Sequence, residues 1–122
     1  MSCIFCEIPQ KRIVCENDLA VAIFDTYPVN PGHMLIIPRR HIVSFFDATN
    51  EEVTAITELL HKCKDLLDEQ YHPDGYNVGV NCGSAAGQTI MHVHVHLIPR
   101  HSGDIENPRG GVRGVIPEKR MY

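Results

Sequence analysis

The sequence predicts an α+β domain in which one long helix covers one face of an antiparallel sheet. Three observations lead to this fold class: short apolar runs bounded by turn-forming residues, one long segment with helical periodicity, and further strand-like runs after it. A chain of 122 residues has the length of one domain. We therefore expect a single domain over residues 1–122, with residues 100–122 as a C-terminal tail.

The first two apolar runs are LAVAIFD (19–25) and HMLIIP (33–38), and TYPVNPG joins them. Both runs have the length and composition of strands. The Pro, Asn and Gly residues between them are turn formers. The sequence therefore predicts an antiparallel pair.

The long periodic segment begins after Thr49, which is followed three residues later by Glu52 in the pattern of a capping box. Apolar residues then recur at the spacing of one helix face: Val53, Ile56, Leu59, Leu60, Cys63, Leu66 and Leu67. This pattern predicts a helix from about residue 50 to residue 69, ended by HPDG (72–75), with Cys63 facing the core.

Two more strands are expected after the helix. YNVGVN (76–81) alternates between apolar and polar residues, and residues 91–98 form an apolar run that contains three histidines and is followed by Pro99. The segment CGSAAGQT (82–89) lies between them and is rich in small residues, which is typical of a loop.

The three histidines occupy alternate positions, at His92, His94 and His96. Side chains alternate across a strand, so these three share one face, and successive imidazoles are separated by about 6.6 Å. A solvated strand face needs no histidine at all, so the pattern indicates a chemical function.

Two chemical interpretations remain open from the residues alone. Histidines two positions apart on a strand can bind one metal ion, although three in a row span about 13 Å and exceed the reach of a single ion. Alternatively, a neutral imidazole can act as a nucleophile toward phosphorus. Loop 82–89 favours the second interpretation, because a glycine-rich turn can direct backbone N–H groups at phosphate oxygens.

Composition excludes several classes of protein. The net charge of −4 provides no overall positive field, so we expect no long nucleic acid partner. No apolar run approaches the roughly 20 residues that cross a membrane, and the start of the sequence lacks a signal peptide pattern, so we expect a cytoplasmic protein. Five cysteines, an odd number, favour metal binding or free thiols over disulfides.

Several blocks of the sequence resemble the histidine triad (HIT) superfamily of nucleotide hydrolases and transferases. HVHVHLI (92–98) matches the triad signature itself. SCIFCEI at the start, residues 22–42, NCGSAAGQT (81–89) and HLIPR (96–100) are similar to the family's other blocks, in order. The resemblance implies a five-stranded antiparallel sheet with one long helix and a short N-terminal helix, and it implies a homodimer.

The same resemblance implies a two-step reaction at the α-phosphate of a purine nucleotide. His94 is then the nucleophile that forms a nucleotidyl-histidine intermediate, while His96 and His33 flank the phosphate. The implied substrate-binding residues are Asn81, Gly87 and Thr89 at the phosphate, Asp25 at the ribose, and Phe5, Ile8 and Ile23 around the base. The C-terminal tail is similar to that of bacterial members described as dinucleoside polyphosphate hydrolases, which favours such a substrate.

Some branches of the superfamily also contain zinc. The resemblance assigns a Cys3-x-x-Cys6 pair, His41 of PRRH (38–41) and His92 to one zinc site. Four protein ligands close the coordination shell, so we expect a structural zinc ion. This assignment leaves His94 and His96 free for catalysis.

Other possibilities remain open from the sequence. The tail either extends freely or folds over the mouth of the site, with Arg109 or Arg113 near a polyphosphate. The function is either nucleotide hydrolysis, nucleoside phosphoramidase activity, or nucleotide binding in a regulatory module with little catalysis. A metalloenzyme that uses the histidine triad itself as its metal centre is a further alternative.

Overall fold

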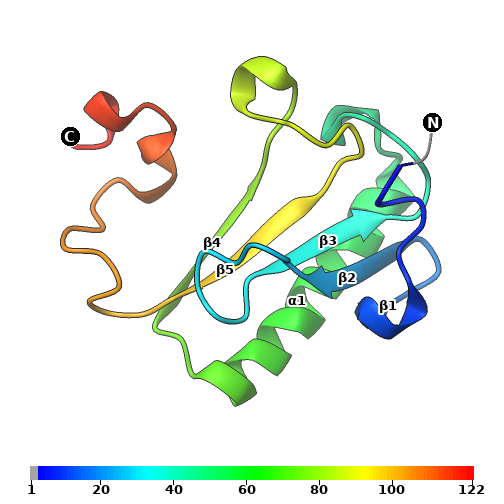
Figure 1. Ribbon diagram of the computed structural model, residues 1–122, viewed down its shortest axis with the longest axis horizontal. Coiled ribbons are helices and arrows are strands. Elements are labelled where there is room, and N and C mark those ends of the chain that lie inside the picture. The colour runs from blue at the N-terminus through cyan, green and yellow to red at the C-terminus, as the bar shows by residue number, and fades with distance from the viewer. Residues whose placement is uncertain (1–2) are drawn as a thin grey trace.

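The computed structural model describes residues 3–122, so the first two residues of the predicted domain, including Ser2 of the SCIFCEI block, lie outside the described residues. Five strands form one antiparallel sheet in the order β1-β2-β3-β5-β4, and a long helix lies across one face (Figure 1). The elements are β1 (Ile13–Glu16), β2 (Ala20–Phe24), β3 (Met34–Pro38), α1 (Asn50–Tyr71), β4 (Gly75–Val80) and β5 (Val95–Arg100). The predicted fold class is confirmed. The short N-terminal helix is η1 (Gln10–Arg12), a single turn of 3-10 helix.

Helix α1 begins with the predicted capping box. The Glu52 backbone N–H donates to the Thr49 hydroxyl at 3.1 Å, and the Thr49 N–H donates to the Glu52 carboxylate at 2.9 Å. The Arg40 guanidinium donates to the same carboxylate at 2.8 Å. These hydrogen bonds, with that from Arg40 the largest influence, lower the pKa of Glu52 to about 2. The start of the helix is thereby attached to the segment that follows β3.

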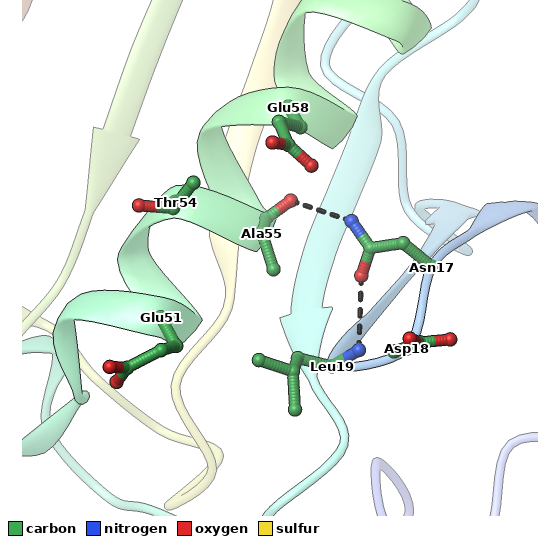
Figure 2. Close-up of a pocket in the computed structure, with 7 residues that line it drawn as sticks. All are labelled: Asn17, Asp18, Leu19, Glu51, Thr54, Ala55 and Glu58. Atoms are coloured by element: carbon green, nitrogen blue, oxygen red, sulfur yellow. Dashed lines mark hydrogen bonds between the residues drawn. The ribbon is translucent and has the colours of Figure 1, made fainter.

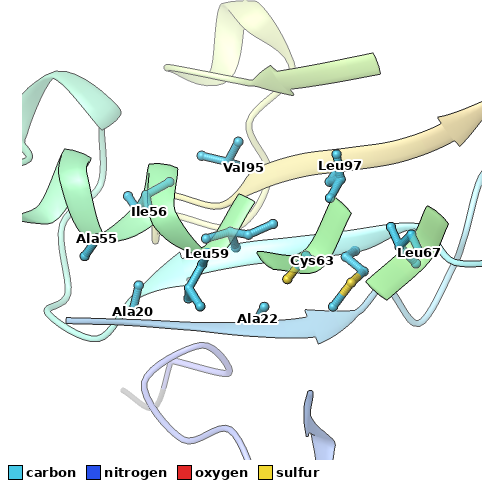
Figure 3. Close-up of a cluster of buried hydrophobic side chains, with 11 residues drawn as sticks. Ala20, Ala22, Ala55, Ile56, Leu59, Cys63, Leu67, Val95 and Leu97 are labelled. Atoms are coloured by element: carbon cyan, nitrogen blue, oxygen red, sulfur yellow. The ribbon is translucent and has the colours of Figure 1, made fainter. Parts of the chain in front are cut away.

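The main hydrophobic core lies between α1 and the sheet (Figure 3). It contains Ala20, Ala22, Met34, Ile36, Val95 and Leu97 from the strands and Ala55, Ile56, Leu59, Cys63 and Leu67 from the helix. The opposite, open face of the sheet carries a smaller cluster of Phe5, Val21, Ile23, Leu35 and Ile37. Alternate residues of β2 and β3 therefore belong to different clusters, as the two-residue period of a strand requires. The prediction that Cys63 faces the core is confirmed, and burial raises the pKa of its thiol to about 12.

The sequence patterns locate only four of the five strands that the resemblance implies. They do not locate β1, because its four residues are too few to show a clear alternation. A signal follows it nevertheless: the Asn17 side chain accepts the Leu19 N–H at 3.1 Å and the Ala20 N–H at 2.9 Å, which forms an Asx turn between β1 and β2.

The histidine strand begins at Val95 rather than at residue 91. A strand needs a neighbour to bond with, and β4 pairs only with residues 95–100 while β3 pairs only with residues 95–97. The strand also continues through Pro99 instead of ending before it. Proline is tolerated there because β5 has only β4 as a neighbour at that position.

The tail leaves the sheet after Arg100 and contains two turns of 3-10 helix, η4 (Gly111–Val115) and η5 (Pro117–Lys119). The Arg113 guanidinium donates to the Lys119 carbonyl at 2.9 Å, and that of Arg120 donates to the Arg109 carbonyl at 2.9 Å. The tail therefore folds largely on itself, beside β4 (Figure 1). Within the described part of the chain, no helix has the length and apolar composition needed to cross a membrane.

Candidate active site and metal centre

The open face of the sheet carries a pocket of about 310 Å³. The residues that form its walls are Ile4, Phe5, Arg12, Asp25, Thr26, Tyr27, Leu35, Asn81, Gly87, Thr89, Ile90, His94 and His96. Seven of the predicted catalytic and substrate-binding residues are among them: Phe5, Asp25, Asn81, Gly87, Thr89, His94 and His96. The structure thus brings together residues that are far apart in the sequence.

The three histidines of the triad lie side by side on the open face. The ring centroids of His94 and His96 are 5.2 Å apart, which is closer than the strand spacing predicts, because His94 precedes the first residue of β5. The ring of Phe5 contacts His94 edge-on at 5.1 Å and His92 at 6.1 Å. The N-terminal segment therefore packs directly on the histidine run.

One hydrogen bond determines which nitrogen of His94 is free. Its Nδ1 lies 2.9 Å from the carbonyl oxygen of His92. A carbonyl oxygen only accepts, so Nδ1 carries the hydrogen and donates it. In the neutral ring, Nε2 then has the lone pair and is the nucleophilic atom.

A second chain of hydrogen bonds orients His96. The backbone N–H of Val29 donates to His33 Nδ1 at 3.0 Å, so the hydrogen of the neutral His33 ring lies on Nε2. His33 Nε2 in turn donates to His96 Nδ1 at 2.9 Å, which leaves a hydrogen on Nε2 of His96. His33 is 2% exposed and does not line the pocket. His33 therefore lies behind His96 and is hydrogen-bonded to it, and its implied role beside the phosphate stays a prediction.

Burial favours the uncharged form of both of these histidines. It lowers the pKa of His33, against a smaller opposing effect of Asp25, and it lowers the pKa of His96, where His94 and His33 act in the same direction. A neutral His33 is what the bond from Val29 requires, because a charged ring has no acceptor.

Asp25 has two roles at the end of β2. One carboxylate oxygen accepts the Tyr27 N–H at 2.8 Å and stabilises the turn. The other lies 3.4 Å from His33 Nε2. Asp25 also lines the pocket, so its position fits both the turn and the substrate-binding interpretation.

Loop 82–89 forms one wall of the pocket through Gly87 and Thr89. Gly83 and Gly87 have φ angles of 92° and 95°, in the left-handed region that favours glycine. They bracket the 3-10 turn η3 (Ser84–Ala86) and leave the backbone exposed. The N–H groups of Gly83, Ala86, Gly87 and Gln88 are hydrogen-bonded within the loop, so an anion has to be bound by the other N–H groups of the loop and by its hydroxyl side chains.

At the other end of the histidine run, the structure brings the four predicted metal ligands together. The ligand atoms of Cys3, Cys6, His41 and His92 all lie within 4.8 Å of one another. The sulfurs of Cys3 and Cys6 are 3.4 and 3.5 Å from His92 Nδ1, and that of Cys6 is 3.2 Å from His41 Nδ1. Tetrahedral zinc with its usual bond lengths places sulfur and nitrogen ligands about 3.6 Å apart.

The tautomer of His92 also fits a metal ion. Its Nε2 lies 2.8 Å from the Pro38 carbonyl oxygen and must donate, so Nδ1 has the lone pair and faces the two sulfurs. Desolvation and the neighbouring Cys3 raise the pKa of the Cys6 thiol, and a bound cation would oppose this shift. The donor set and its protonation therefore suit zinc.

A second group of potential metal ligands, Asp25, His33 and His96, does not pass the same test. The Val29 N–H occupies Nδ1 of His33, so Nε2 has a hydrogen and no lone pair for an ion. Among residues 3–122, His94 belongs to neither group. The alternative of a metal centre that includes the middle histidine has no support in this geometry.

The large aliphatic and aromatic residues in the pocket wall, apart from Tyr27 and the histidines, are Ile4, Phe5, Leu35 and Ile90. Ile8 packs against the cluster on the open face but does not line the pocket. Ile23 is fully buried within that cluster. Ile23 therefore lies in the core next to the pocket and supports its wall, rather than contacting a base directly as the resemblance implies.

Three residues of the site carry no clear signal in the sequence. Arg12 is the only Arg or Lys residue of the described chain in the pocket wall, and it donates to the Thr26 hydroxyl at 3.2 Å. Tyr27 lies at the pocket edge and is 86% exposed. Gln88 is buried inside loop 82–89. Each is placed by tertiary structure, and the tail arginines are absent from the pocket wall.

Another pocket, of about 340 Å³, lies between the β1–β2 turn and α1 (Figure 2). Asn17 attaches the turn to the helix there, by donating to the Ala55 carbonyl at 2.9 Å. The charged residues that line this second pocket are Asp18, Glu51 and Glu58, and no histidine or cysteine lines it. The groups suited to catalysis therefore gather on the open face.

The fold and the site together define a domain whose histidine run is shared between a candidate metal site and a pocket. A model of the HIT domain family matches residues 7–103. The chain belongs to this family, and the predicted membership of the histidine triad superfamily is confirmed.

Known relatives cover most of the chain. AP-4-A phosphorylase of Mycobacterium tuberculosis is 35% identical over 106 residues, which cover 82% of this chain and 54% of the relative. Bis(5'-adenosyl)-triphosphatase of Dictyostelium discoideum is 36% identical over 100 residues, which cover 82% of this chain and 67% of the relative. The crystal structure of a zinc-bound histidine triad family protein from Mycobacterium smegmatis is 35% identical, with a TM-score of 0.77, covering 88% and 81%.

Proposed function

We propose that this protein is a nucleotide hydrolase that cleaves at the α-phosphate of a purine nucleotide through a nucleotidyl-His94 intermediate. The observation that carries the proposal is the bond from His94 Nδ1 to the His92 carbonyl, which leaves Nε2 as the free nitrogen of a residue in the pocket wall. A dinucleoside polyphosphate is the proposed substrate. The names of two relatives, AP-4-A phosphorylase and bis(5'-adenosyl)-triphosphatase, support this class.

In the first step, the lone pair of His94 Nε2 attacks the α-phosphorus, the phosphorus–nitrogen bond forms, and the bond to the leaving phosphate oxygen breaks. The leaving group departs as an anion and accepts a hydrogen bond from Nε2–H of His96. In the second step, water attacks phosphorus and the electron pair of the phosphorus–nitrogen bond returns to Nε2. The product is a nucleoside monophosphate, and one proton passes to solvent.

The remaining pocket residues bind and orient the substrate. Loop 82–89 offers backbone N–H groups and the Thr89 hydroxyl to the phosphate oxygens, where negative charge grows in the transition state. The apolar end around Phe5 encloses the base, and Asp25 accepts hydrogen bonds from the ribose.

We propose that Cys3, Cys6, His41 and His92 bind a zinc ion that has a structural role. When bound, it supplies a fixed positive charge that keeps both thiols deprotonated. It then connects the N-terminal segment to the open face, where Phe5 packs on His94. The zinc-bound relative supports this proposal.

We also propose a homodimer that forms through β4. This strand is the last in the sheet, so one of its edges pairs with no other strand of the described chain. Val78 on β4 is 49% exposed and lines an apolar groove with Leu60 and Tyr76. Light scattering of the wild type and of Val78→Lys tests the assembly, with a shift from dimer to monomer expected.

Trapping the intermediate tests the proposed function directly. The protein is mixed with diadenosine polyphosphates and, in parallel, with an adenosine phosphoramidate, then quenched in base and weighed intact. An adenylyl adduct in the wild type and none in His94→Asn is the expected result. Faster turnover of the phosphoramidate would instead identify a phosphoramidase, and nucleotide binding without turnover of any substrate would identify a binding module.

A further inference from the structure

Gln88 is a buried polar side chain in a loop whose other residues are exposed or half-buried. It is 3% exposed, while its neighbours Gly87 and Thr89 are exposed and line the pocket. Its Oε1 accepts the Gly83 N–H at 2.8 Å. Its Nε2 donates to the Ile90 carbonyl at 3.1 Å, so one amide group fixes both ends of the loop from inside.

The same amide also reaches the segment that follows β3. Gln88 Nε2 donates to the Val43 carbonyl at 2.7 Å, the shortest of its three hydrogen bonds. Val43 belongs to a connecting segment, residues 41–43, in which each residue contacts a different part of the site. His41 Nδ1 lies 3.2 Å from the Cys6 sulfur, and the Ile42 carbonyl accepts the Val93 N–H at 2.9 Å.

We propose that Gln88 is a positioning residue that holds loop 82–89 in its catalytic geometry and couples it, through the connecting segment, to the metal centre. The inference rests on the proposed function. Loop amides stabilise a transition state only if they are in place before charge develops, so loss of the Gln88 bonds lowers kcat more than substrate binding. Coupling between two sites is reciprocal, so nucleotide binding and zinc binding strengthen each other through this side chain.

The first test compares Gln88→Met with Gln70→Met in the zinc-loaded protein. Methionine has the length of glutamine without its hydrogen bonds, and Gln70 is exposed in the last turn of α1. For Gln88→Met we expect kcat to fall roughly 10- to 100-fold with KM changed less than about threefold, and Gln70→Met to match the wild type. Reduced thermal stability with unchanged kcat would show a structural role alone and overturn the proposal.

A second variant covers the case in which Gln88→Met does not fold. Gln88→Asn keeps an amide but is one methylene shorter, so it cannot reach the Gly83 and Val43 backbones together. We expect kcat to decrease in Gln88→Asn as well, by a smaller factor than in Gln88→Met. An asparagine variant with the kcat of the wild type would contradict the proposed role.

The coupling is measured without catalysis. Zinc affinity is determined by competition with a chelating dye, in the presence and absence of AMP. AMP should raise the zinc affinity of the wild type roughly fivefold or more and that of Gln88→Met much less. No effect of AMP on the wild type, or an equal effect on both proteins, overturns the coupling.

The two proposals fail in different ways. If the wild type binds no AMP and forms no adduct, the proposed function is wrong, and this inference is lost with it. If the wild type binds AMP and turns over substrate, but Gln88→Met behaves like Gln70→Met, only the inference about Gln88 is wrong.

Discussion

His92 and His94 lie two residues apart on the same face of the same segment, yet the structure prepares them for opposite tasks. His92 donates from Nε2 to the Pro38 carbonyl and has its free nitrogen, Nδ1, at the two cysteines. His94 donates from Nδ1 to the His92 carbonyl and has Nε2 free. A backbone carbonyl selects the tautomer in each case. Different hydrogen bonds therefore leave a different ring nitrogen free in each of two identical side chains, which suits His92 to the proposed metal site and His94 to the proposed nucleophilic role.

The largest expected effect separates the two histidines by function. His94→Asn should lower kcat at least about 10⁴-fold, because the nucleophile is lost, while the zinc content stays at one ion per chain. Steady-state turnover of a diadenosine polyphosphate and metal analysis of the same sample measure both quantities. The control is His61→Asn, a change at an exposed histidine of α1. Substantial turnover by His94→Asn would mean that another group attacks phosphorus.

The metal end should show the converse behaviour. Cys3→Ser is expected to lose zinc and to lower the free energy of unfolding by at least about 2 kcal/mol. Turnover should fall far less than in His94→Asn, because the carbonyl that orients His94 belongs to the backbone and remains. Metal analysis and urea unfolding measure the effect, with Cys82→Ser as the matched control. Loss of zinc from Cys82→Ser, or none from Cys3→Ser, would contradict the assigned ligands.

The fold class and the separation of candidate metal ligands from pocket residues could be predicted from the sequence, because both follow from local patterns and family blocks. The tautomer of each histidine, meaning which ring nitrogen carries the hydrogen, could not be predicted from the sequence. The Pro38 carbonyl that orients His92 is separated from it by 54 residues, and the Val29 N–H that orients His33 is supplied by an irregular turn. These partners become visible only when the strands are paired.

Two further residues show the same limit. Gln88 has an ordinary polar identity in a loop, and its burial depends on Val43, 45 residues away. Ile23 has the apolar character expected of a base-binding residue, but sheet packing places it in the core. Periodicity identifies which face a residue lies on, and it does not reveal whether a neighbour covers that residue.

The role of His33 behind His96 predicts a smaller effect than loss of the nucleophile. His33→Leu should lower kcat roughly 10- to 100-fold, because His96 Nδ1 loses the donor that fixes its ring. Glutamine has both an acceptor for the Val29 N–H and a donor for His96, so His33→Gln should restore much of the activity. Steady-state kinetics of the two variants give the comparison. Equal activity of the leucine and glutamine variants would show that the hydrogen-bond chain does not matter.

The smallest effect concerns pH and tests whether the buried His33 is neutral in the folded state. Burial lowers the pKa of His33 and of His96 below that of an unfolded histidine, which is about 6.5. As the pH falls below 6.5, the unfolded chain therefore takes up protons that the folded protein does not, and the free energy of unfolding decreases. Urea unfolding at pH 7.5 and 5.5, with zinc saturating, should show a decrease on the order of 1 kcal/mol larger in the wild type than in His33→Gln. This window lies above the range in which carboxylates titrate, so the difference between the two proteins reports the imidazole. An equal decrease in both would mean that His33 is charged in the folded state, which the Val29 N–H on its Nδ1 does not allow.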